Sequence, residues 1–278
     1  PRTLTIDDRQ QAEEAAETIR FPCLLKPSLR GPVWDQHAKL KAYRASDPAE
    51  LLMLYDRLSP LAERLIAQEW IEGPESNLFS CNCYLDADSK TLAPFVARKL
   101  RQWPPDVGMS SLGEECRNDV VLREAVQFFE AVHFHGLAYL EMKQDERTGE
   151  HLALEVNVGR PTGRSAIAEA GGVELLYAAY CDAVGLPLPT GLEQRYSGVK
   201  WIYLREDVRA ALTRHRRGEL GVREWWRSVR GPKAYAVLSF RDPAPFLSDL
   251  LRSAAKFVRA AAGRVGRRRS RQTPGEAG

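Results

Sequence analysis

The spacing of hydrophobic and polar positions changes along the chain, and each change predicts a different element. Apolar residues three and four positions apart, behind capping side chains, predict helices that begin at Asp7 or Asp8 and at Ser46-Asp47-Pro48. Short apolar runs bounded by polar loops predict buried strands at 21–28 and 64–71. The first part of the chain therefore mixes helices with strands.

Strand-like patterns dominate the middle of the chain. We expect further strands at 76–86, 91–100, 136–143 and 151–157, with helices near 118–132 and 165–184. Residues 29–45 contain Gly, Pro and several basic residues, which predicts a loop or a mobile hairpin. No G-x-G-x-x-G or Walker loop occurs. Because neighbouring strands are antiparallel in this order, the pattern indicates an α+β fold.

The last two of these strands carry an unusual set of polar side chains. A short turn joins the strands, which predicts an antiparallel hairpin centred near residue 147 or 148. Glu155 and Asn157 share a face because side chains alternate along a strand, and Glu141 joins them from the facing strand. Oxygen-only ligands of this kind suit Mg²⁺ or Mn²⁺. A solvent-facing sheet with ordinary acids is the alternative, and the residues alone leave both open.

The composition narrows the class of protein. The chain has 278 residues, of which 44% are hydrophobic and 28% charged, as in ordinary globular proteins. No run reaches the roughly 18 apolar residues of a membrane helix. The N-terminal segment lacks a signal-peptide core and does not begin with Met, so we expect a fragment of a longer protein. Five cysteines without a C-x-x-C pair favour reduced thiols in a cytoplasmic protein.

The net charge of +3 hides an asymmetry between two parts of the chain. Residues 1–200 hold 22 Lys or Arg against 30 Asp or Glu, whereas residues 201–278 hold 18 against 7. The basic excess is greatest in 264–278, which predicts a disordered tail. Such a tail can bind nucleic acid or anionic lipid. A solvated tail is the preferred interpretation, with no specific nucleic-acid or membrane partner.

Four short motifs follow one another between about residues 20 and 185. They are FPCLLKPS, LIAQEWIEGPES, LAYLEMK and ALEVN. Together they resemble the ATP-grasp superfamily, whose members mostly activate a carboxylate as an acyl phosphate and pass it to an amine or another nucleophile. The resemblance implies two α+β subdomains that clasp ATP, followed here by a C-terminal α/β extension. Family members normally have a preceding domain with a further phosphate-binding lysine, and we expect this chain to begin after both.

The resemblance also implies a role for individual residues. Lys26 corresponds to the lysine that holds the nucleotide phosphates. Backbone and side-chain atoms of the linker would frame the adenine and reach the ribose, at Gln68, Glu69, Ile71 and Glu75. The metal ligands, for Mg²⁺ or Mn²⁺ bridged to ATP, would be Glu141, Glu155 and Asn157. The alternative for Lys26 is a strand-end lysine that extends its amine to solvent.

Other cations are candidates for the transferring phosphoryl group. Arg98, Lys99 and Arg101 fall where related ligases carry a phosphate-contacting lysine. Strand alternation places Lys99 and Arg101 on one face and Arg98 on the other, which favours the first two, although a solvated edge strand is the alternative. Arg160 and Arg164 follow the metal motif in NVGRPTGR, where an arginine can clamp an acyl phosphate. That loop has one residue more between Asn157 and Arg160 than the common family pattern.

The preferred interpretation is that the chain is an ATP- and Mg²⁺-dependent carboxylate–amine ligase that forms an amide or peptide-like bond. Its partners would be small-molecule carboxylates and amines, and a homo-oligomeric assembly stays open. A non-catalytic ATP-binding remnant and a basic nucleic-acid or membrane-docking module are the alternatives. The expected parts are an incomplete N-terminal subdomain, a C-terminal subdomain, an extension and the tail, at 1–72, 73–185, 186–263 and 264–278. We expect the extension to be ordered and to bury Trp201, Tyr203 and Phe240.

Overall fold

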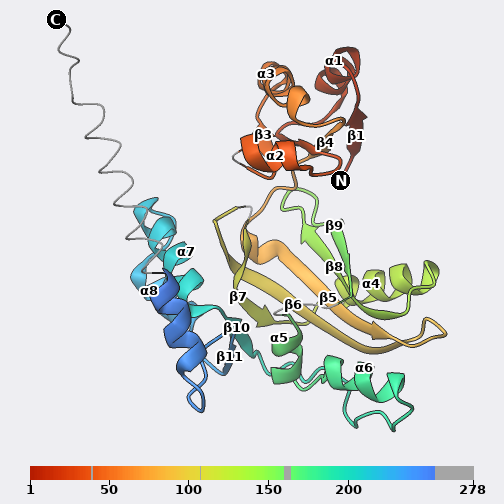
Figure 1. The fold of residues 1–278 in the computed structure, drawn as a ribbon, viewed down its shortest axis with the longest axis vertical. Helices are drawn as coiled ribbons and strands as arrows, with labels where there is room; N and C mark the ends of the chain where they lie inside the picture. The colour runs from red at the N-terminus through yellow and green to blue at the C-terminus, as the bar shows by residue number, and fades with distance from the viewer. Residues whose placement is uncertain (39, 107, 160–163, 254–278) are drawn as a thin grey trace, which may run out of the picture. The chain divides into compact units, whose positions relative to one another are not determined.

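The computed structural model describes residues 1–38, 40–106, 108–159 and 164–253, with helices and sheets that confirm the α+β prediction (Figure 1). Contacts divide the chain into two compact units. The first combines Pro1–Phe79 with Leu140–Asn157, and the second combines Ser80–Tyr139 with Val158–Gly278. The four parts expected from the sequence stay a prediction. Among the described residues, no helix is long and apolar enough to cross a bilayer.

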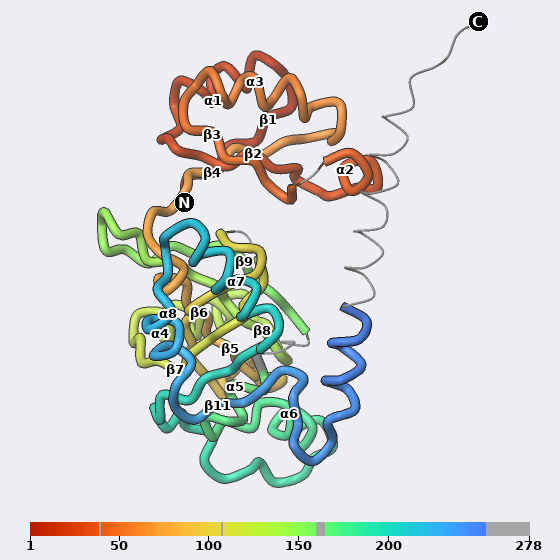
Figure 2. Tube along the Cα trace, turned by 90° about the vertical axis from the view of Figure 1, so that its left-hand side faces the viewer, coloured from red at the N-terminus to blue at the C-terminus, as the bar shows by residue number. Residues whose placement is uncertain are grey.

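The first unit is built on an antiparallel sheet of four strands in the order β1-β4-β2-β3. The strands are β1 (Thr3–Ile6), β2 (Cys23–Pro27), β3 (Tyr43–Ala45) and β4 (Leu65–Glu69). The helices α1 (Arg9–Thr18) and α3 (Pro48–Leu58) lie together on one side of this sheet, as two views show (Figures 1 and 2). Their apolar faces and the inner face of the sheet form one buried core.

Capping side chains fix where these two helices begin. The carboxylate of Asp8 accepts a hydrogen bond from the Gln11 backbone N–H, and Asp47 accepts one from Glu50. Both caps agree with the sequence prediction. The prediction for 29–45 was wrong, because this segment contains α2 (Pro32–His37) and β3, and the indole of Trp34 is buried.

A larger sheet has seven strands in the order β11-β10-β7-β6-β5-β8-β9. Their bounds are β5 (Leu78–Leu85), β6 (Thr91–Trp103), β7 (Met109–Glu115), β8 (Gly136–Gln144), β9 (His151–Val158), β10 (Lys200–Ile202) and β11 (Lys233–Tyr235). The helix α4 (Asp119–Ala131) precedes β8. The short helices α5 (Arg164–Ala170) and α6 (Leu175–Ala183) contribute to a buried core with β6.

Two glycines divide the single helix that was expected at 165–184. The backbone of Gly172 has φ +93°, a left-handed conformation that side chains disfavour. A Cβ on Gly171 would stand 2.4 Å from the ring of Phe95. The helix therefore ends at this point, and the two shorter helices α5 and α6 replace it.

Residues 200–235 of the expected extension are ordered and add two strands to the large sheet. β10 pairs antiparallel with β7, and β11 pairs parallel with β10. The helices α7 (Leu204–Arg216) and α8 (Val222–Ser228) belong to the same segment. Trp201 and Tyr203 are half-buried, but Phe240 is 86% exposed, so its predicted burial was wrong. The tail at 264–278 lies outside the described residues.

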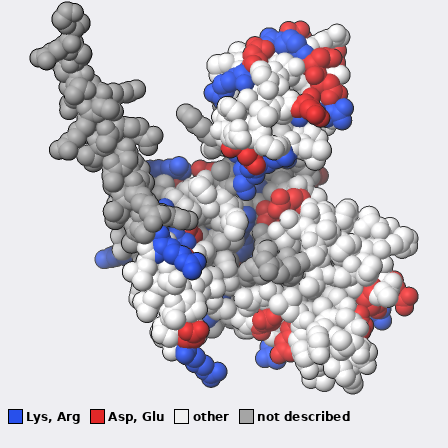
Figure 3. All heavy atoms as spheres, in the orientation of Figure 1, with Lys and Arg blue, Asp and Glu red and all other residues white. Residues whose placement is uncertain are grey.

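Several arginines of the extension pair with nearby acids. Lys and Arg atoms lie close to Asp and Glu atoms at several places on the face shown in Figure 3. Ion pairs join Arg209 to Glu206 at 3.2 Å, Arg217 to Asp106 at 3.1 Å, and Arg214 to Glu219 at 3.7 Å. The Arg217–Asp106 pair joins the extension to an earlier part of the chain, whereas the other two pairs lie within the extension.

Candidate functional site

The predicted phosphate lysine lies on β2 and contacts a second predicted residue on β4. In the antiparallel register Leu24 stands opposite Gln68, so Lys26, two positions further on, points to the same face. Its Nζ donates to Gln68 Oε1 at 3.0 Å, and the lysine side chain is only half-buried. The structure thus brings together Lys26 and Gln68, which are 42 positions apart in the sequence.

The linker that follows β4 turns sharply and is packed. Ile71 and Glu75 are buried, with 4% and 7% of their surface exposed. Gly73 has φ +117°, and a Cβ there would stand 2.7 Å from Asn77 Nδ2, so only glycine fits this turn. Glu69 accepts a hydrogen bond from the Arg2 backbone N–H at 3.3 Å. The predicted adenine and ribose residues therefore lie on one short, shaped segment.

The β8–β9 hairpin closes as a tight turn. The N–H of Asp145 donates to Glu150 O at 2.8 Å, and that of Gly149 donates to Asp145 O at 2.7 Å. Gly149 has φ +75°, which such a turn requires. The Asp145 carboxylate is buried, and hydrogen bonds from the Arg147 side chain, helped by its backbone and the charge of Arg20, lower its pKa to about 2. The turn is centred between residues 147 and 148, where the sequence pattern put it.

Two of the three predicted metal ligands touch each other. Asn157 Nδ2 donates to Glu155 Oε1 at 3.0 Å on β9, where Glu155 is exposed and Asn157 is half-buried. Glu141 is buried on β8. A regular ladder continued from the Asp145–Glu150 pair would set Glu141 opposite Leu154. A common face for Glu141 and Glu155 therefore requires one extra residue in a strand, a β-bulge.

The donor set fits a hard cation by its chemistry, since it offers two carboxylates and one amide oxygen. Among the described residues, no group of three or more His, Cys, Asp or Glu side chains is placed to hold a metal ion. The expected set contains only two such residues and one asparagine. The metal site accordingly stays a prediction.

The prediction that Lys99 and Arg101 share a face was wrong, because the β6–β7 ladder is irregular between them. Lys99 pairs with Gly113, whereas Arg101 pairs with Leu112. These two partners are successive positions of β7, so their side chains, and those opposite them, point to opposite faces. The bulge at Leu100 is the physical reason.

Arg101 is held in a buried ion pair with the extension. Its Nε and Nη2 donate to the two carboxylate oxygens of Asp207 at 2.8 and 3.1 Å, and its Nη1 donates to Ser228 Oγ at 2.8 Å. The indole of Trp225 donates to the same carboxylate at 2.9 Å. The two charged side chains are 5% and 0% exposed. Lys99 is also buried, and its Nζ donates to Gln102 Oε1 at 3.3 Å.

The two arginines of the NVGRPTGR loop lie at the edge of the described residues. Arg160 lies outside the described residues. Arg164 is the first residue of α5, and its side chain is likewise outside the description. Their clamping role stays a prediction.

Sequence reasoning missed Lys143, which stands two positions after Glu141 in the motif LAYLEMK. Its amine is buried and donates to Ile71 O, the carbonyl of a predicted adenine-framing residue, at 2.7 Å. A lysine in the same strand and on the same face as a predicted metal ligand was the available signal.

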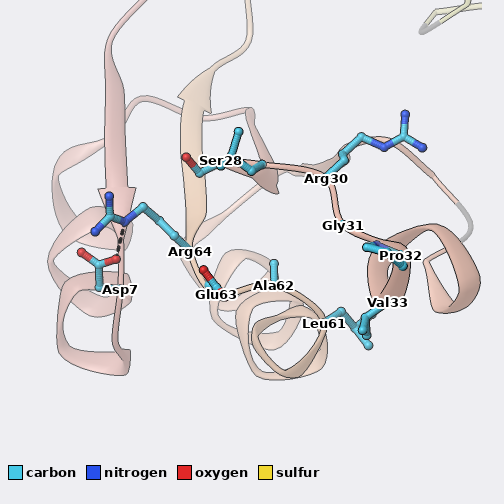
Figure 4. A pocket seen from close by; sticks show the side chains of 11 residues that line it. Asp7, Ser28, Arg30, Gly31, Pro32, Val33, Leu61, Ala62, Glu63 and Arg64 are labelled. Atoms are coloured by element: carbon cyan, nitrogen blue, oxygen red, sulfur yellow. Dashed lines mark hydrogen bonds and ion pairs between the residues drawn. The ribbon is translucent and has the colours of Figure 1, made fainter.

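A hollow of about 560 Å³ lies in the first unit beside the loop that follows Lys26 (Figure 4). Its wall includes Ser28, Arg30 and Arg64, with Leu61 below them. The guanidinium of Arg64 pairs with Asp7, as the dashed line marks, and that of Arg30 pairs with Asp35. None of the predicted site residues that the structure describes lines this hollow.

Two curated proteins resemble this chain. The D-aspartate ligase of Enterococcus faecium is 25% identical over 174 residues, which is 59% of this chain and 41% of that protein. The D-alanine–D-alanine ligase of Stutzerimonas stutzeri is 25% identical over 170 residues, which is 56% of this chain and 49% of that protein. The chain thus spans about half the length of the curated relatives that it matches. No model of a known protein family matches it.

Solved structures share the fold. The biotin carboxylase domain of the Hydrogenobacter thermophilus 2-oxoglutarate carboxylase, in complex with MgADP, ADP and bicarbonate, superposes with a TM-score of 0.53. It is 15% identical, and the likeness covers 69% of this chain and 43% of that one. These likenesses confirm the fold that the sequence motifs implied.

Proposed function

We propose that the chain, which shares the ATP-grasp fold, belongs to the ATP-grasp superfamily and acts in an ATP- and Mg²⁺-dependent ligase that joins a carboxylate to an amine. One observation carries the proposal. Lys26 and Gln68 meet on one face of the small sheet, and the shaped linker with Ile71 and Glu75 follows directly. Both curated relatives are named as ligases of D-amino acids.

In the proposed reaction a carboxylate oxygen attacks the γ-phosphorus of ATP, and ADP leaves. The amine nitrogen then attacks the carbonyl carbon of the acyl phosphate, loses a proton and releases phosphate. The chain has to neutralise charge on the phosphates and hold the reactants in line, which needs positioning more than a protein nucleophile. Mg²⁺ would be held by Glu141, Glu155 and Asn157 and would withdraw charge from the phosphate oxygens.

The nucleotide would be held by the first unit. Lys26 would place a compact positive charge against the phosphates, exchanging its neutral partner Gln68 for an anion. The linker from Gln68 to Ile71, Glu69 included, would frame the adenine with backbone atoms. The Glu75 carboxylate would accept hydrogen bonds from the ribose hydroxyls.

Among the remaining cations, we propose Lys99 for the phosphoryl group, together with Arg160 and Arg164. Arg101 does not belong to this set, because the buried carboxylate of Asp207 already neutralises it in a bidentate pair. A cytoplasmic location belongs to the same proposal. The described cysteines Cys23, Cys81, Cys83, Cys116 and Cys181 are all free thiols, which supports a reducing compartment.

ADP release by the full chain tests the proposal. D-aspartate and D-alanine are the first acids and amines to combine with MgATP, because both relatives are named for D-amino acids. We expect release of ADP that depends on both an acid and an amine and that Glu155→Gln abolishes. Release at the same rate with and without either substrate would contradict ligation, and tight ATP binding without any release would favour the non-catalytic remnant.

A further inference from the structure

Three successive carbonyls of the linker each receive a donor from the β8–β9 hairpin. Arg147 Nη2 donates to Trp70 O at 3.4 Å, and Lys143 Nζ donates to Ile71 O at 2.7 Å. The backbone N–H of Glu146 donates to Glu72 O at 3.2 Å. All of these residues belong to the first unit. The linker path is therefore set by the hairpin as well as by its own turn at Gly73.

Lys143 makes the shortest of these contacts. A hydrogen bond from an ammonium to a carbonyl is stronger than one between neutral groups. The side chain is 8% exposed, so this bond is shielded from water. The same ammonium lies 5.2 Å from the centroid of the Trp70 ring, within the range of a cation–π contact.

The Trp70 ring receives a second cation. The guanidinium of Arg44, on β3, stands 5.3 Å from the ring centroid and 4.0 Å from the Glu72 carboxylate. The backbone N–H of Trp70 donates to Pro22 O at 3.1 Å. The linker is thus tied to the small sheet through Trp70 and to the hairpin through its carbonyls.

We infer that Lys143, assisted by Arg147, is a positioning residue that presets the linker for the nucleotide base. This inference rests on the proposed ATP-dependent function. A segment already fixed in its bound path loses less freedom when a ligand binds, and the affinity rises accordingly. The effect concerns the base and not the phosphates, because neither donor belongs to the residues proposed to hold phosphate.

Calorimetry on the full chain with two probes separates binding of the base from binding of the phosphates. MgATP presents both base and phosphates, whereas magnesium tripolyphosphate presents phosphates alone. We expect Lys143→Met, which keeps the length and removes the ammonium, to weaken MgATP binding about tenfold. Tripolyphosphate binding should not change. Lys143→Arg, which keeps a charged donor, should recover part of the loss.

Lys90→Met is the matched control, since Lys90 is an exposed lysine of the β5–β6 turn. It should change neither affinity. A fluorine resonance from 5-fluorotryptophan at Trp70, assigned by its absence from Trp70→Phe, should shift in Lys143→Met before any nucleotide is added. A general loss of stability would weaken the binding of both probes, and would not weaken MgATP binding alone.

Equal MgATP affinity of Lys143→Met and the wild type, or an equal loss for both probes, would overturn the inference while the proposed function stands. If the wild type binds neither probe, both the inference and the proposed function are contradicted. If Lys143→Met does not fold, Arg147→Met carries the test through the neighbouring carbonyl of Trp70. A selective loss of MgATP then supports the inference, and any other result overturns it.

Discussion

Lys26 and Arg101 are both cations on strands, and the sequence motifs assigned both to phosphate. Their surroundings differ. Lys26 is half-buried and donates one hydrogen bond to the neutral amide of Gln68, whereas Arg101 is buried with a bidentate bond to Asp207. A cation beside a neutral group keeps its charge available to an anion. A cation matched by a buried carboxylate has its charge neutralised, and it contributes to structure.

The comparison also separates two energy scales. A hydrogen bond to a neutral partner contributes about 1 kcal/mol to stability. Removing one partner of a buried ion pair costs about 3–5 kcal/mol, because the other charge is left without compensation. Substitutions should therefore distinguish the two environments by their effect on the free energy of unfolding.

The largest effect is expected at the buried pair. Asp207→Ala should lower the free energy of unfolding by about 3–5 kcal/mol, because Arg101 and Trp225 would lose their acceptor. Urea denaturation measures the loss. Asp88→Ala, at an exposed turn position, is the control and should stay within about 0.5 kcal/mol of the wild type. Equal midpoints for the two variants would show that the pair does not stabilise the extension.

A smaller effect is expected at the hairpin turn. The pKa of Asp145 is about 2 in the folded chain, below its ordinary value of 3.8. Because the folded pKa is lowered, this carboxylate stabilises the fold fully above the unfolded pKa. The stabilisation, about 2 kcal/mol, is lost as the pH falls from about 4 to about 2.

Denaturation curves at several pH values check this sign. Between about pH 5 and pH 2.5 the wild type should lose about 1.5 kcal/mol more than Asp145→Asn, which cannot titrate at this position. Parallel losses in the two proteins would mean that Arg147 does not hold this carboxylate in solution.

The smallest effect on stability is expected at the predicted metal ligands. Glu155 is exposed, so Glu155→Gln should change the free energy of unfolding by less than about 0.5 kcal/mol. The same variant should lose ATP turnover at matched Mg²⁺, because one ligand charge is removed from a site facing a triphosphate. Turnover equal to that of the wild type would remove Glu155 from the metal site.

The sequence predicted the features that depend on local chemistry. The caps at Asp8 and Asp47 follow from side-chain acceptors beside apolar helical patterns, and the hairpin turn follows from its polar residues and Gly149. The contact between Lys26 and Gln68 depends on the pairing of β2 with β4, which the sequence pattern did not indicate.

Other features depend on tertiary context that alternation does not contain. A two-residue period assumes an unbroken ladder, and the bulge at Leu100 reverses the faces beyond it. The helix break at Gly171 depends on the ring of Phe95, which lies far away in the sequence. The partner of Lys143 is a backbone carbonyl in another segment, which no spacing rule indicates.

Calorimetric titration of MgATP into the full chain and into Lys26→Ala tests the central claim most directly. The wild type should bind MgATP, and Lys26→Ala should bind it about 10- to 100-fold more weakly, a loss of about 1.4–2.8 kcal/mol. Lys26→Arg should not restore the affinity fully, because a planar fork and a compact ammonium fill different spaces. Equal affinity of the wild type and Lys26→Ala would make Lys26 a strand-end charge and contradict the account.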